Sequence, residues 1–429
     1  MKIAIVGAGW AGMAAAVAAL QHGHQPTVFE AARTIGGRAR ALQCTLPDGT
    51  PVTLDNGQHI LIGAYTETLR LMRQMGVAPA SALLNVPMTL LFPDGLGLRF
   101  PAWPTPLDAL AGIVTARGWS LADKLSLLRV ATGWQLRGFQ CAASTSVAQL
   151  CVGLRPRVLA ELIEPLCVSA LITPAERASA AVFLRVLRDA LFGVQGGSRL
   201  LLPRVDLTAL FPAAAARWIG ERGAELRLGT RVDSVQRQGA GWQVQHEAFD
   251  AVILATSASN AAQTVAAIKV NATNLVANEF QAWAACARAL QFEAITTVYA
   301  WGAGARLAEP MLSLRSQAEA PAQFVFDRGQ LGGPPGLLAF VISASHGTRA
   351  ALETQVLRQA QSQLGLTLQA VQTVVDKRAT FACTPGLQRP PQQIAAHLLA
   401  CGDYVDGPYP ATLEGAIRSG LSAVAALKR

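Results

Sequence analysis

Apolar runs and glycine-rich turns alternate at the start of the chain. Residues 2–6 (KIAIV) form a short apolar run, which is typical of a buried parallel strand. The alanine-rich stretch after Gly12 predicts a helix that runs to about Leu20 and ends near Gly23. A second strand is predicted over Thr27–Glu30 and ends in an acid. The order strand, glycine turn, helix and strand predicts a βαβ unit.

The later pattern predicts a helical middle and a return to strands. Between residues 106 and 192, Leu and Val recur at three- and four-residue steps with Arg between them, so this stretch is mostly helical. Such a stripe usually forms core, and a membrane-facing or substrate-channel surface is the alternative. The remaining predicted elements are helices at 211–222 and from 410 onward, and strands at 226, 230–236, 242–245, 251–256, 295–299, 337–342 and 397–401.

Length and composition limit the class of protein. A chain of 429 residues predicts two or three domains, and 51% hydrophobic against 15% charged residues excludes intrinsic disorder. The uncharged stretches 78–93 and 251–268 are interrupted by prolines or polar residues, so neither predicts a membrane-spanning helix. No signal peptide is recognisable. We therefore expect a cytoplasmic protein that is either soluble or peripheral on the inner face of the cell membrane.

Charge and cysteine content narrow the partners. The net charge is +9, but the arginines are scattered and no nucleic-acid-binding signature accompanies them, which argues against nucleic acid. Positive charge combined with a mean hydropathy of +0.31 favours contact with a lipid surface. The seven cysteines include no CxxC pair, so neither a metal site nor a disulfide framework is predicted, and we expect buried, reduced thiols.

The first glycines form a dinucleotide-binding fingerprint. Gly7 permits the tight turn, Gly9 lets a pyrophosphate approach the backbone, and Gly12 lets the helix pack on the strand. The helix N-terminus offers free N–H groups to the phosphates. Glu30 would accept hydrogen bonds from the ribose hydroxyls, and the Gly36-Gly37-Arg38 turn adds a cation near the same phosphates.

The C-terminus predicts a second contribution to the same site. Gly402-Asp403 follows a strand, and a helix starts after Pro410. Ligands of open α/β sheets bind at the carboxyl ends of the strands, so Asp403 and this helix start should face the crevice of Gly7 to Gly12.

Together these segments resemble the superfamily of flavin-dependent amine oxidases and phytoene desaturases. The resemblance rests on residues 6–12, Phe29-Glu30, Gly36-Gly37-Arg38, Gly402-Asp403 and residues 410–416. It implies an α/β fold, with a Rossmann-type FAD-binding domain (GR2-like) and an inserted α+β substrate domain. It assigns FAD contacts to these residues: Gly7, Ala8, Gly9, Trp10, Ala11, Gly12, Glu30, Gly37, Arg38, Val232 at the adenine, Gly402, Asp403, Ala411, Thr412 and Leu413.

The resemblance also divides the chain. Residues 1–65, 196–260 and 395–429 would form a discontinuous FAD-binding domain. Residues 66–195 and 261–394 would form the substrate-binding domain, with a largely helical part near 106–192.

Further segments are similar to one branch, the squalene-associated FAD-dependent desaturases, now understood as hydroxysqualene dehydroxylases. These segments are 55–65, 377–381, Pro385-Gly386 and Arg389-Pro390. The branch implies squalene and hopanoid biosynthesis, a polyprenyl substrate in a long apolar tunnel, and an unidentified flavin reductant. In its reaction, hydroxysqualene loses its allylic hydroxyl and reduced FAD supplies hydride to the carbon. Gly57, Gln58 and His59 would lie near the flavin, and His59 is the candidate proton donor, with a packing or flavin-contact role as its alternative.

Other functions remain open at this stage. A carotenoid or phytoene-type desaturase is one, although such enzymes are usually longer. An amine oxidase would need a lysine near the flavin, for which only Lys269 and Lys377 lie mid-chain, and an aromatic pair, for which Tyr404 and Tyr409 are poor candidates. A reductase with two nucleotide sites lacks a second glycine fingerprint between Gly196 and Thr256. A membrane-surface protein with a purely structural FAD is the non-enzyme alternative.

Overall fold

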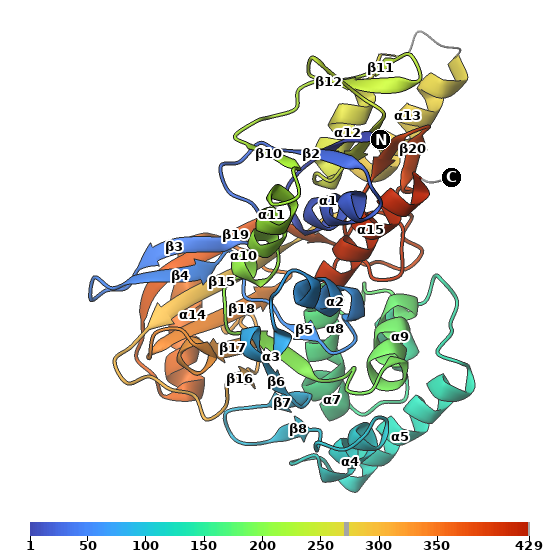
Figure 1. Cartoon of the computed structure of the whole chain (residues 1–429). Coiled ribbons are helices and arrows are strands. Elements are labelled where there is room, and N and C mark those ends of the chain that lie inside the picture. Colours follow the sequence, from blue (N-terminus) through green and yellow to red (C-terminus); the bar gives the residue numbers. More distant parts are fainter. Residues whose placement is uncertain (270–273, 428–429) are drawn as a thin grey trace.

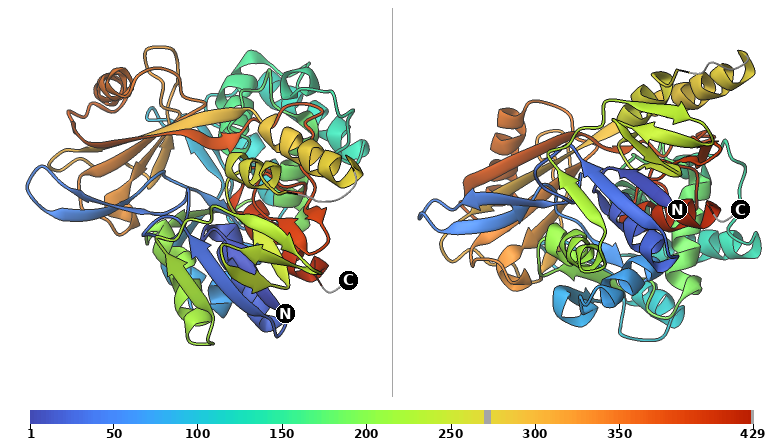
Figure 2. Two further views of the ribbon diagram at one scale, coloured as in Figure 1. Left: turned by 90° about the horizontal axis from the view of Figure 1, so that it is seen from above. Right: turned by 45° about the horizontal axis from the view of Figure 1, so that its top comes forward.

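The computed structural model describes residues 1–269 and 274–427 and arranges them in three groups of elements (Figures 1 and 2). A mostly parallel sheet holds the start of the chain and packs on its last helix. An antiparallel sheet (orange in Figure 2) and the helices between residues 107 and 193 (teal to green) form the other two groups.

The parallel sheet confirms the predicted βαβ unit. Its six strands lie in the order β10 (Glu225–Leu228), β2 (Gln25–Glu30), β1 (Lys2–Val6), β14 (Ala251–Leu254), β21 (Leu398–Ala400) and β20 (Gln393–Ala395). All neighbours are parallel except β20 and β21. The central strands are apolar on both faces because both faces are covered.

Each face of the sheet has its own cover. Ile3 and Ile5 pack in one cluster with α1 (Trp10–Gln21), α11 (Pro212–Gly220) and α15 (Leu413–Ala426). Ala4 and Val6 point the other way, towards α12 (Ala258–Ala266) and the meander β11 (Val235–Gln238), β12 (Gly241–Val244) and β13 (Glu247–Phe249). The alternation of side chains along a strand produces these two cores.

The start of one predicted strand is wrong. The sequence predicts a strand over 230–236, but β11 begins only at Val235. The chain leaves the sheet at Gly229, whose φ is +66°, and the N–H of Thr230 bonds to the carbonyl of Glu30. Residues 230–233 therefore do not pair with a strand but line a cavity.

The second sheet is antiparallel throughout. Its order is β16 (Met311–Ser313), β17 (Phe324–Asp327), β18 (Leu337–Ser343), β15 (Phe292–Trp301) and β19 (Gln369–Phe381), with α14 (Arg349–Leu364) packed on it. The long strand β15 lies at the predicted strand of residues 295–299, and β18 lies at 337–342.

Short elements join the two sheets. They are the pair β3 (Ala41–Thr45) and β4 (Pro51–Asp55), the pair β7 (Thr89–Leu91) and β8 (Gly97–Arg99), and the triplet β5 (Leu61–Ile62), β9 (Leu200–Pro203) and β6 (Leu83–Val86). The short helices here are α2 (Thr66–Gln74), α3 (Pro79–Ala82), α10 (Leu207–Leu210) and the 3₁₀ turn η3 (Arg328–Leu331).

The middle of the chain is helical, as the Leu and Val spacing predicts. It contains α4 (Leu107–Thr115), α5 (Leu121–Leu136), α6 (Val147–Leu150), α7 (Pro156–Val158), α8 (Glu164–Ala170) and α9 (Ala180–Arg188). Two π-helical turns, η1 (Leu159–Ile163) and η2 (Asp189–Gly193), continue α7 and α9. π-Helical turns occur most often beside functional sites.

The α/β, Rossmann-type fold class is confirmed, whereas the domain limits stay a prediction. All strands of the parallel sheet lie in the three segments predicted to bind FAD, except that β20 begins at Gln393. However, α2 packs on α15, and α13 (Asn274–Arg288) packs on α12, although both lie in segments predicted for the substrate domain. The expectation of buried thiols is wrong for Cys44, Cys141 and Cys286, which are half-buried.

Candidate functional site

A large cavity runs from the carboxyl end of the parallel sheet into the helical region. Its volume is about 1140 Å³, which exceeds the roughly 300–1,000 Å³ of sites that hold one drug-sized ligand. Residues from all three groups of elements line it. The cavity therefore has room for a dinucleotide and part of a second molecule.

The glycine turn at one end shows two different uses of glycine. A Cβ on Gly12 would lie 1.9 Å from the carbonyl oxygen of Gly7, so Gly12 is required for the packing of α1 on β1. A Cβ on Gly9 would meet only the Cα of Gly37, at 3.9 Å. The protein itself therefore leaves the space beside Gly9 empty, and that space belongs to the cavity.

The N-terminus of α1 opens into the same space. Gly9 is its N-cap and offers no side chain to the free N–H groups of the first turn. Gly9, Trp10 and Ala11 all line the cavity. Unsatisfied N–H groups and the positive end of the helix dipole attract an anion such as a phosphate.

Glu30 is held at the end of β2. One carboxylate oxygen accepts a hydrogen bond from the N–H of Ala8 and the other from the N–H of Ala32, each at 2.8 Å. Each carboxylate oxygen can accept a further bond, and Glu30 lines the cavity. The side chain can therefore receive ribose hydroxyls while the backbone fixes its orientation.

Arg38 and Asp403 form an ion pair between the two ends of the chain. The guanidinium lies 2.5 Å from Asp403 Oδ1 and 2.5 Å from the carbonyl oxygen of Ala379. The charge of Asp403 raises the pKa of Arg38. Both residues line the cavity with Gly36 and Gly37, as the sequence predicts.

The end of β4 is fixed by bonds to the start of α10 and to the antiparallel sheet. The buried carboxylate of Asp55 accepts a bond from the N–H of Leu207 at 2.8 Å, and its carbonyl accepts one from the Tyr299 hydroxyl at 2.8 Å. Burial raises the pKa of Asp55 to about 7. Beyond it, the buried Arg328 donates to the side-chain oxygen of Gln58 at 3.2 Å.

His59 faces the cavity from this segment. Its Nδ1 lies 2.7 Å from the carbonyl oxygen of Gly57. A carbonyl can only accept, so Nδ1 carries the proton and Nε2 of a neutral ring has a lone pair. Burial lowers the pKa of His59. The bond to Gly57 raises it in part, and the positive charge of the nearby Arg38 lowers it further.

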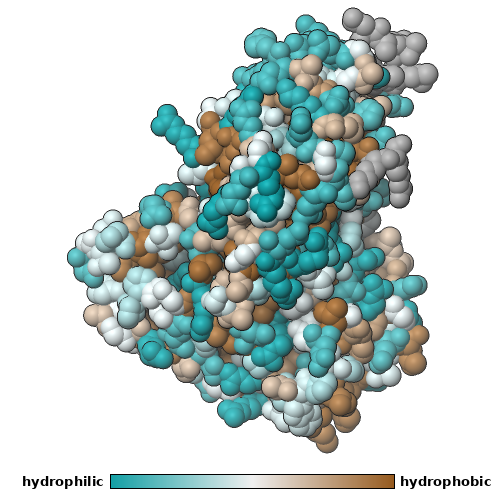
Figure 3. Space-filling model, viewed as in Figure 1, coloured by the Kyte–Doolittle hydropathy of each residue, from teal (hydrophilic) through white to brown (hydrophobic). Residues whose placement is uncertain are grey.

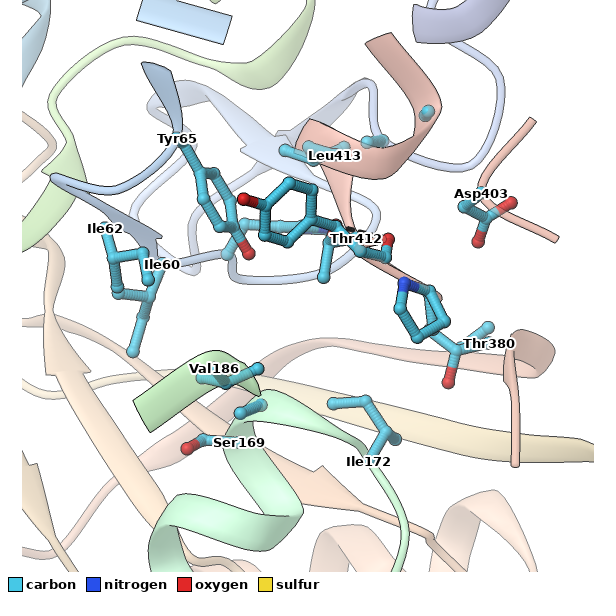
Figure 4. A pocket seen from close by; sticks show the side chains of 18 of the residues that line it. Ile60, Ile62, Tyr65, Ser169, Ile172, Val186, Thr380, Asp403, Thr412 and Leu413 are labelled. Atoms are coloured by element: carbon cyan, nitrogen blue, oxygen red, sulfur yellow. Dashed lines mark hydrogen bonds between the residues drawn. The ribbon is translucent and has the colours of Figure 1, made fainter. Parts of the chain in front are cut away.

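The start of α15 closes the cavity from the C-terminal side. Thr412 caps the helix by accepting from the N–H of Gly415 at 2.9 Å, and Thr412 and Leu413 line the cavity. Glu414 does not line the cavity. Its buried carboxylate accepts hydrogen bonds from the backbone N–H of Glu67 and that of Thr68, and it thereby holds α2. Figure 4 shows Tyr65, at the start of α2, beside Leu413 and Thr412.

The opposite wall comes from the helical region and is mainly apolar. In Figure 4, Ser169, Ile172 and Val186 lie across from Tyr65 and Thr412. Ile172 has a φ of +52°, which is a strained conformation for a β-branched residue. Further in, the wall is lined by Leu90, Leu98, Phe100, Ile113, Leu127, Trp134, Phe139, Leu162, Ile163, Leu166, Phe183 and Leu187.

The structure brings most of the predicted cofactor residues together. All of them line the cavity except Ala8 and Gly12, which lie behind the turn. The sequence did not indicate Tyr65, Asp189 or Ile172 as lining residues. Tyr409 lines the cavity, whereas Tyr404 lies buried outside it with no partner for its hydroxyl.

The residues present fit FAD. The empty space beside Gly9, the uncapped start of α1 and the Arg38 guanidinium suit a pyrophosphate, and Glu30 suits a ribose. Within residues 1–269 and 274–427, no group of three or more His, Cys, Asp or Glu side chains is placed to hold a metal ion.

Comparison with known proteins agrees with this fit. The family model of flavin-containing amine oxidoreductases matches residues 10–428. The hydroxysqualene dehydroxylases of Zymomonas mobilis and Rhodopseudomonas palustris are 23% and 26% identical to the chain, over 98% and 97% of its length and 97% and 96% of theirs. Zeta-carotene desaturase of Arabidopsis thaliana is 29% identical over 29% of the chain and 22% of its own length.

Solved structures show the same fold. An oxidoreductase from Methanosarcina mazei superposes with a TM-score of 0.73 at 15% identity, covering 99% of this chain and 100% of its own. Cyclohexylamine oxidase from Brevibacterium oxydans superposes with a TM-score of 0.70 at 17% identity, covering 99% of this chain and 98% of its own.

Proposed function

This chain belongs to the family of flavin-containing amine oxidoreductases and uses FAD, and we propose that it carries out the reductive dehydroxylation of hydroxysqualene to squalene. The observation that carries the proposal is the two-part cavity. Its polar end fits the dinucleotide, and its other end is lined mainly by apolar side chains of the helical region and of the β7–β8 pair. A polyprenyl chain needs such a space because it has almost no polar groups to bind.

FAD would be held by the backbone of the glycine turn, by Glu30 and by the Arg38–Asp403 pair. Gly57, Gln58 and His59 on one side and the backbone of residues 411–413 on the other would lie beside its reacting part. When bound and reduced, FAD supplies the hydride that replaces the hydroxyl.

The protein must also supply a proton and keep water away. The departing oxygen needs a proton to leave as water, and the carbon it leaves has cation character that a nearby nucleophile would trap. The wall of α5, α8 and α9 supports the second requirement, because most of its side chains are apolar. Ser169 and Thr132 carry the hydroxyls on these helices that line the cavity.

His59 is our candidate for the proton donor. Since Nδ1 is committed to the carbonyl of Gly57, the acid is Nε2 of the protonated ring. The lowered pKa makes this proton easy to release but scarce at high pH. The hydroxyls of Tyr65 and Tyr409 line the same cavity, and burial raises the pKa of each, so both stay protonated at neutral pH.

Three further parts of the proposal follow from this reaction. We place the enzyme in squalene and hopanoid biosynthesis, in the cytoplasm and in contact with the inner face of the cell membrane. Among residues 1–269 and 274–427, no helix is long and apolar enough to cross a membrane. A separate reductant must reduce the flavin before each turnover.

The test is anaerobic. The bound FAD is reduced, hydroxysqualene is added in detergent, and the absorbance of oxidised flavin is followed while the lipid is extracted for mass analysis. We expect reoxidation with one squalene per flavin. A flavin that stays reduced would contradict the proposal.

A desaturase is the second candidate, because the same cavity could hold a carotenoid precursor and zeta-carotene desaturases match part of the chain. It predicts reduction of oxidised flavin by a saturated polyprene. An amine oxidase is less well supported, since no lysine of the described residues lines the cavity, Lys269 and Lys377 included.

A further inference from the structure

The mouth of the cavity carries an unusual set of exposed apolar side chains, which we call the docking surface. Eight large side chains form it: Trp103, Leu107, Leu110, Val114, Leu121, Leu125, Phe192 and Val194. Leu121 is 72% exposed and Trp103 60%. Scattered single apolar residues are normal on a surface, but a cluster marks an interaction site.

These side chains lie on neighbouring elements. Leu107, Leu110 and Val114 are spaced three and four residues apart and form one exposed stripe of α4. Lys124 Nζ donates to the carbonyl of Val114 at 2.7 Å, which joins the start of α5 to the end of α4. In Figure 3, hydrophobic surface gathers at the lower end of the molecule, where Figure 1 shows α4 and α5.

The third part of the surface is the end of η2. Residues 104–106 and 191–195 face one another across a small pocket, so Phe192 and Val194 lie beside the start of α4. The ring of Phe192 also packs against the ring of Phe139, which follows α5, with the two ring centroids 5.4 Å apart. Two helices and a π-helical turn therefore present one continuous apolar face.

The exposed charges carried by α4, α5 and their flanking loops are all positive. Between residues 101 and 140 the acidic side chains are Asp108 and Asp123, and both are buried. The exposed charged side chains of the same stretch are Arg117, Arg129 and Arg137. An apolar face rimmed by cations complements a bilayer that contains anionic lipid, whose surface attracts basic residues by about 1 kcal/mol each.

The docking surface is continuous with the cavity. Leu107 and Leu110 are about half exposed and also line the cavity. Leu128, Thr132 and Phe139 of α5 and the following loop continue the wall inward. A lipid that entered between α4, α5 and η2 would pass from a bilayer into the apolar end without crossing water.

We propose that the docking surface lies on the anionic leaflet of a membrane and that the cavity takes up its apolar substrate laterally from that leaflet. The lateral uptake rests on the proposed function, whereas the docking does not. The surface would enter the headgroup region and the upper part of the acyl chains, as interfacial helices do.

The experiment measures vesicle binding of the FAD-loaded protein by sedimentation. The vesicles contain phosphatidylcholine alone or phosphatidylcholine with phosphatidylglycerol. The test variant is Leu121→Glu/Leu125→Glu, whose two leucines are exposed and do not line the cavity. The matched control is Leu228→Glu, an exposed leucine on β10.

We expect the wild type to bind vesicles with phosphatidylglycerol more tightly than vesicles of phosphatidylcholine alone. This difference in affinity should shrink as the salt concentration is raised. The double variant should bind at least about tenfold more weakly, because burial of one leucine already favours binding by about that factor. Leu228→Glu should bind like the wild type. A double variant that binds normally, or a control that loses as much, would overturn the proposal.

A second variant keeps the test valid if the first folds poorly. Arg117→Gln/Arg129→Gln/Arg137→Gln should lose the preference for anionic vesicles, whereas Arg237→Gln/Arg306→Gln/Arg349→Gln, three exposed arginines on other elements, should keep it. An equal loss in both triple variants would show that net charge alone, and not this surface, drives binding.

Activity separates docking from function. With substrate in detergent, Leu121→Glu/Leu125→Glu should reoxidise reduced flavin at the wild-type rate, but with substrate in vesicles it should be slower than the wild type. If even the wild type fails in detergent while vesicle binding follows the expectations above, the proposed function is wrong and the docking stands. Equal rates of variant and wild type on vesicles would refute lateral uptake.

Discussion

Substitutions of Gly9 and Gly12 in the phosphate turn should affect different properties, FAD binding for Gly9 and protein stability for Gly12. Gly9 has φ −76° and ψ −176°, an extended conformation that alanine adopts freely, and its Cβ would meet only the Cα of Gly37 at 3.9 Å. We expect Gly9→Ala to change the stability of the FAD-free protein by no more than about 0.5 kcal/mol, since alanine also lowers the entropy of the unfolded chain.

The same methyl group should weaken FAD binding. It would occupy the space in which the pyrophosphate approaches the backbone, so at least one charge-assisted bond to a phosphate oxygen would be stretched or lost. Such a bond contributes about 1.5–3 kcal/mol, and its loss lowers affinity by about 10- to 150-fold.

Gly12→Ala is the matched control. Its Cβ would lie 1.9 Å from the carbonyl oxygen of Gly7 and 3.1 Å from Ala255 Cβ, so α1 must move off β1. Overpacking of this kind costs about 1–3 kcal/mol or more in the protein without FAD.

Two measurements decide between these expectations. Urea unfolding of the FAD-free proteins gives stability, and titration with FAD followed by flavin fluorescence gives affinity. The reasoning would be refuted if Gly9→Ala bound FAD like the wild type, or if it destabilised the FAD-free protein as much as Gly12→Ala.

Three further outcomes are expected. His59→Asn should lower the rate of flavin reoxidation by hydroxysqualene about 10²–10⁴-fold. The wild-type rate should fall as the pH rises through the lowered pKa of His59. An unchanged rate in His59→Asn would refute His59 as the proton donor and favour a tyrosine in that role. Arg38→Gln and Asp403→Asn should each weaken FAD binding. The double variant should lose less binding free energy than the two single variants together, because Asp403 holds the Arg38 guanidinium in place. Strictly additive losses in this double-mutant cycle would contradict the prediction. The pKa of Asp55 is raised to about 7 in the folded protein, so its protonated form stabilises the fold fully below about pH 4. The free energy of unfolding should then fall by up to about 4 kcal/mol as the pH rises to 7. Asp55→Asn should remove this pH dependence in urea unfolding, and a variant whose stability falls with pH like that of the wild type would refute the role of Asp55.

The glycine turn could be predicted because its requirements are local. The strand, the glycines and the helix follow one another within 20 residues, and the conformation of each depends on its neighbours. That Asp403 shares a cavity with the glycine turn also followed from a general rule, namely that the carboxyl ends of parallel strands share one edge. Its ion pair with Arg38, 365 residues away, was not predicted.

Other parts of the site depend on packing that the sequence does not display. The strained φ of Ile172 has no glycine to indicate it, and the π-helical turn that carries Asp189 reads as ordinary helix. The stretch 230–236, with Thr230, Val232 and Val235, predicts a strand. Its first residues nevertheless lie along the cavity, because the carbonyl of Glu30 fixes Thr230. Glu414 matches the family motif, but its structural task is to hold α2.

The two ends of the cavity are therefore built by different means, and this difference has consequences for how the site can change. The dinucleotide end uses backbone N–H groups, a helix start and the absence of side chains at Gly9, so few substitutions there are tolerated. The apolar end uses side chains of α5, α8 and α9, whose exchange for others of similar volume alters shape without disturbing the parallel sheet. The substrate can thus differ among members of one flavin-containing family. In agreement, this chain is similar in sequence over its whole length to a protein named hydroxysqualene dehydroxylase, and it shares its fold with cyclohexylamine oxidase.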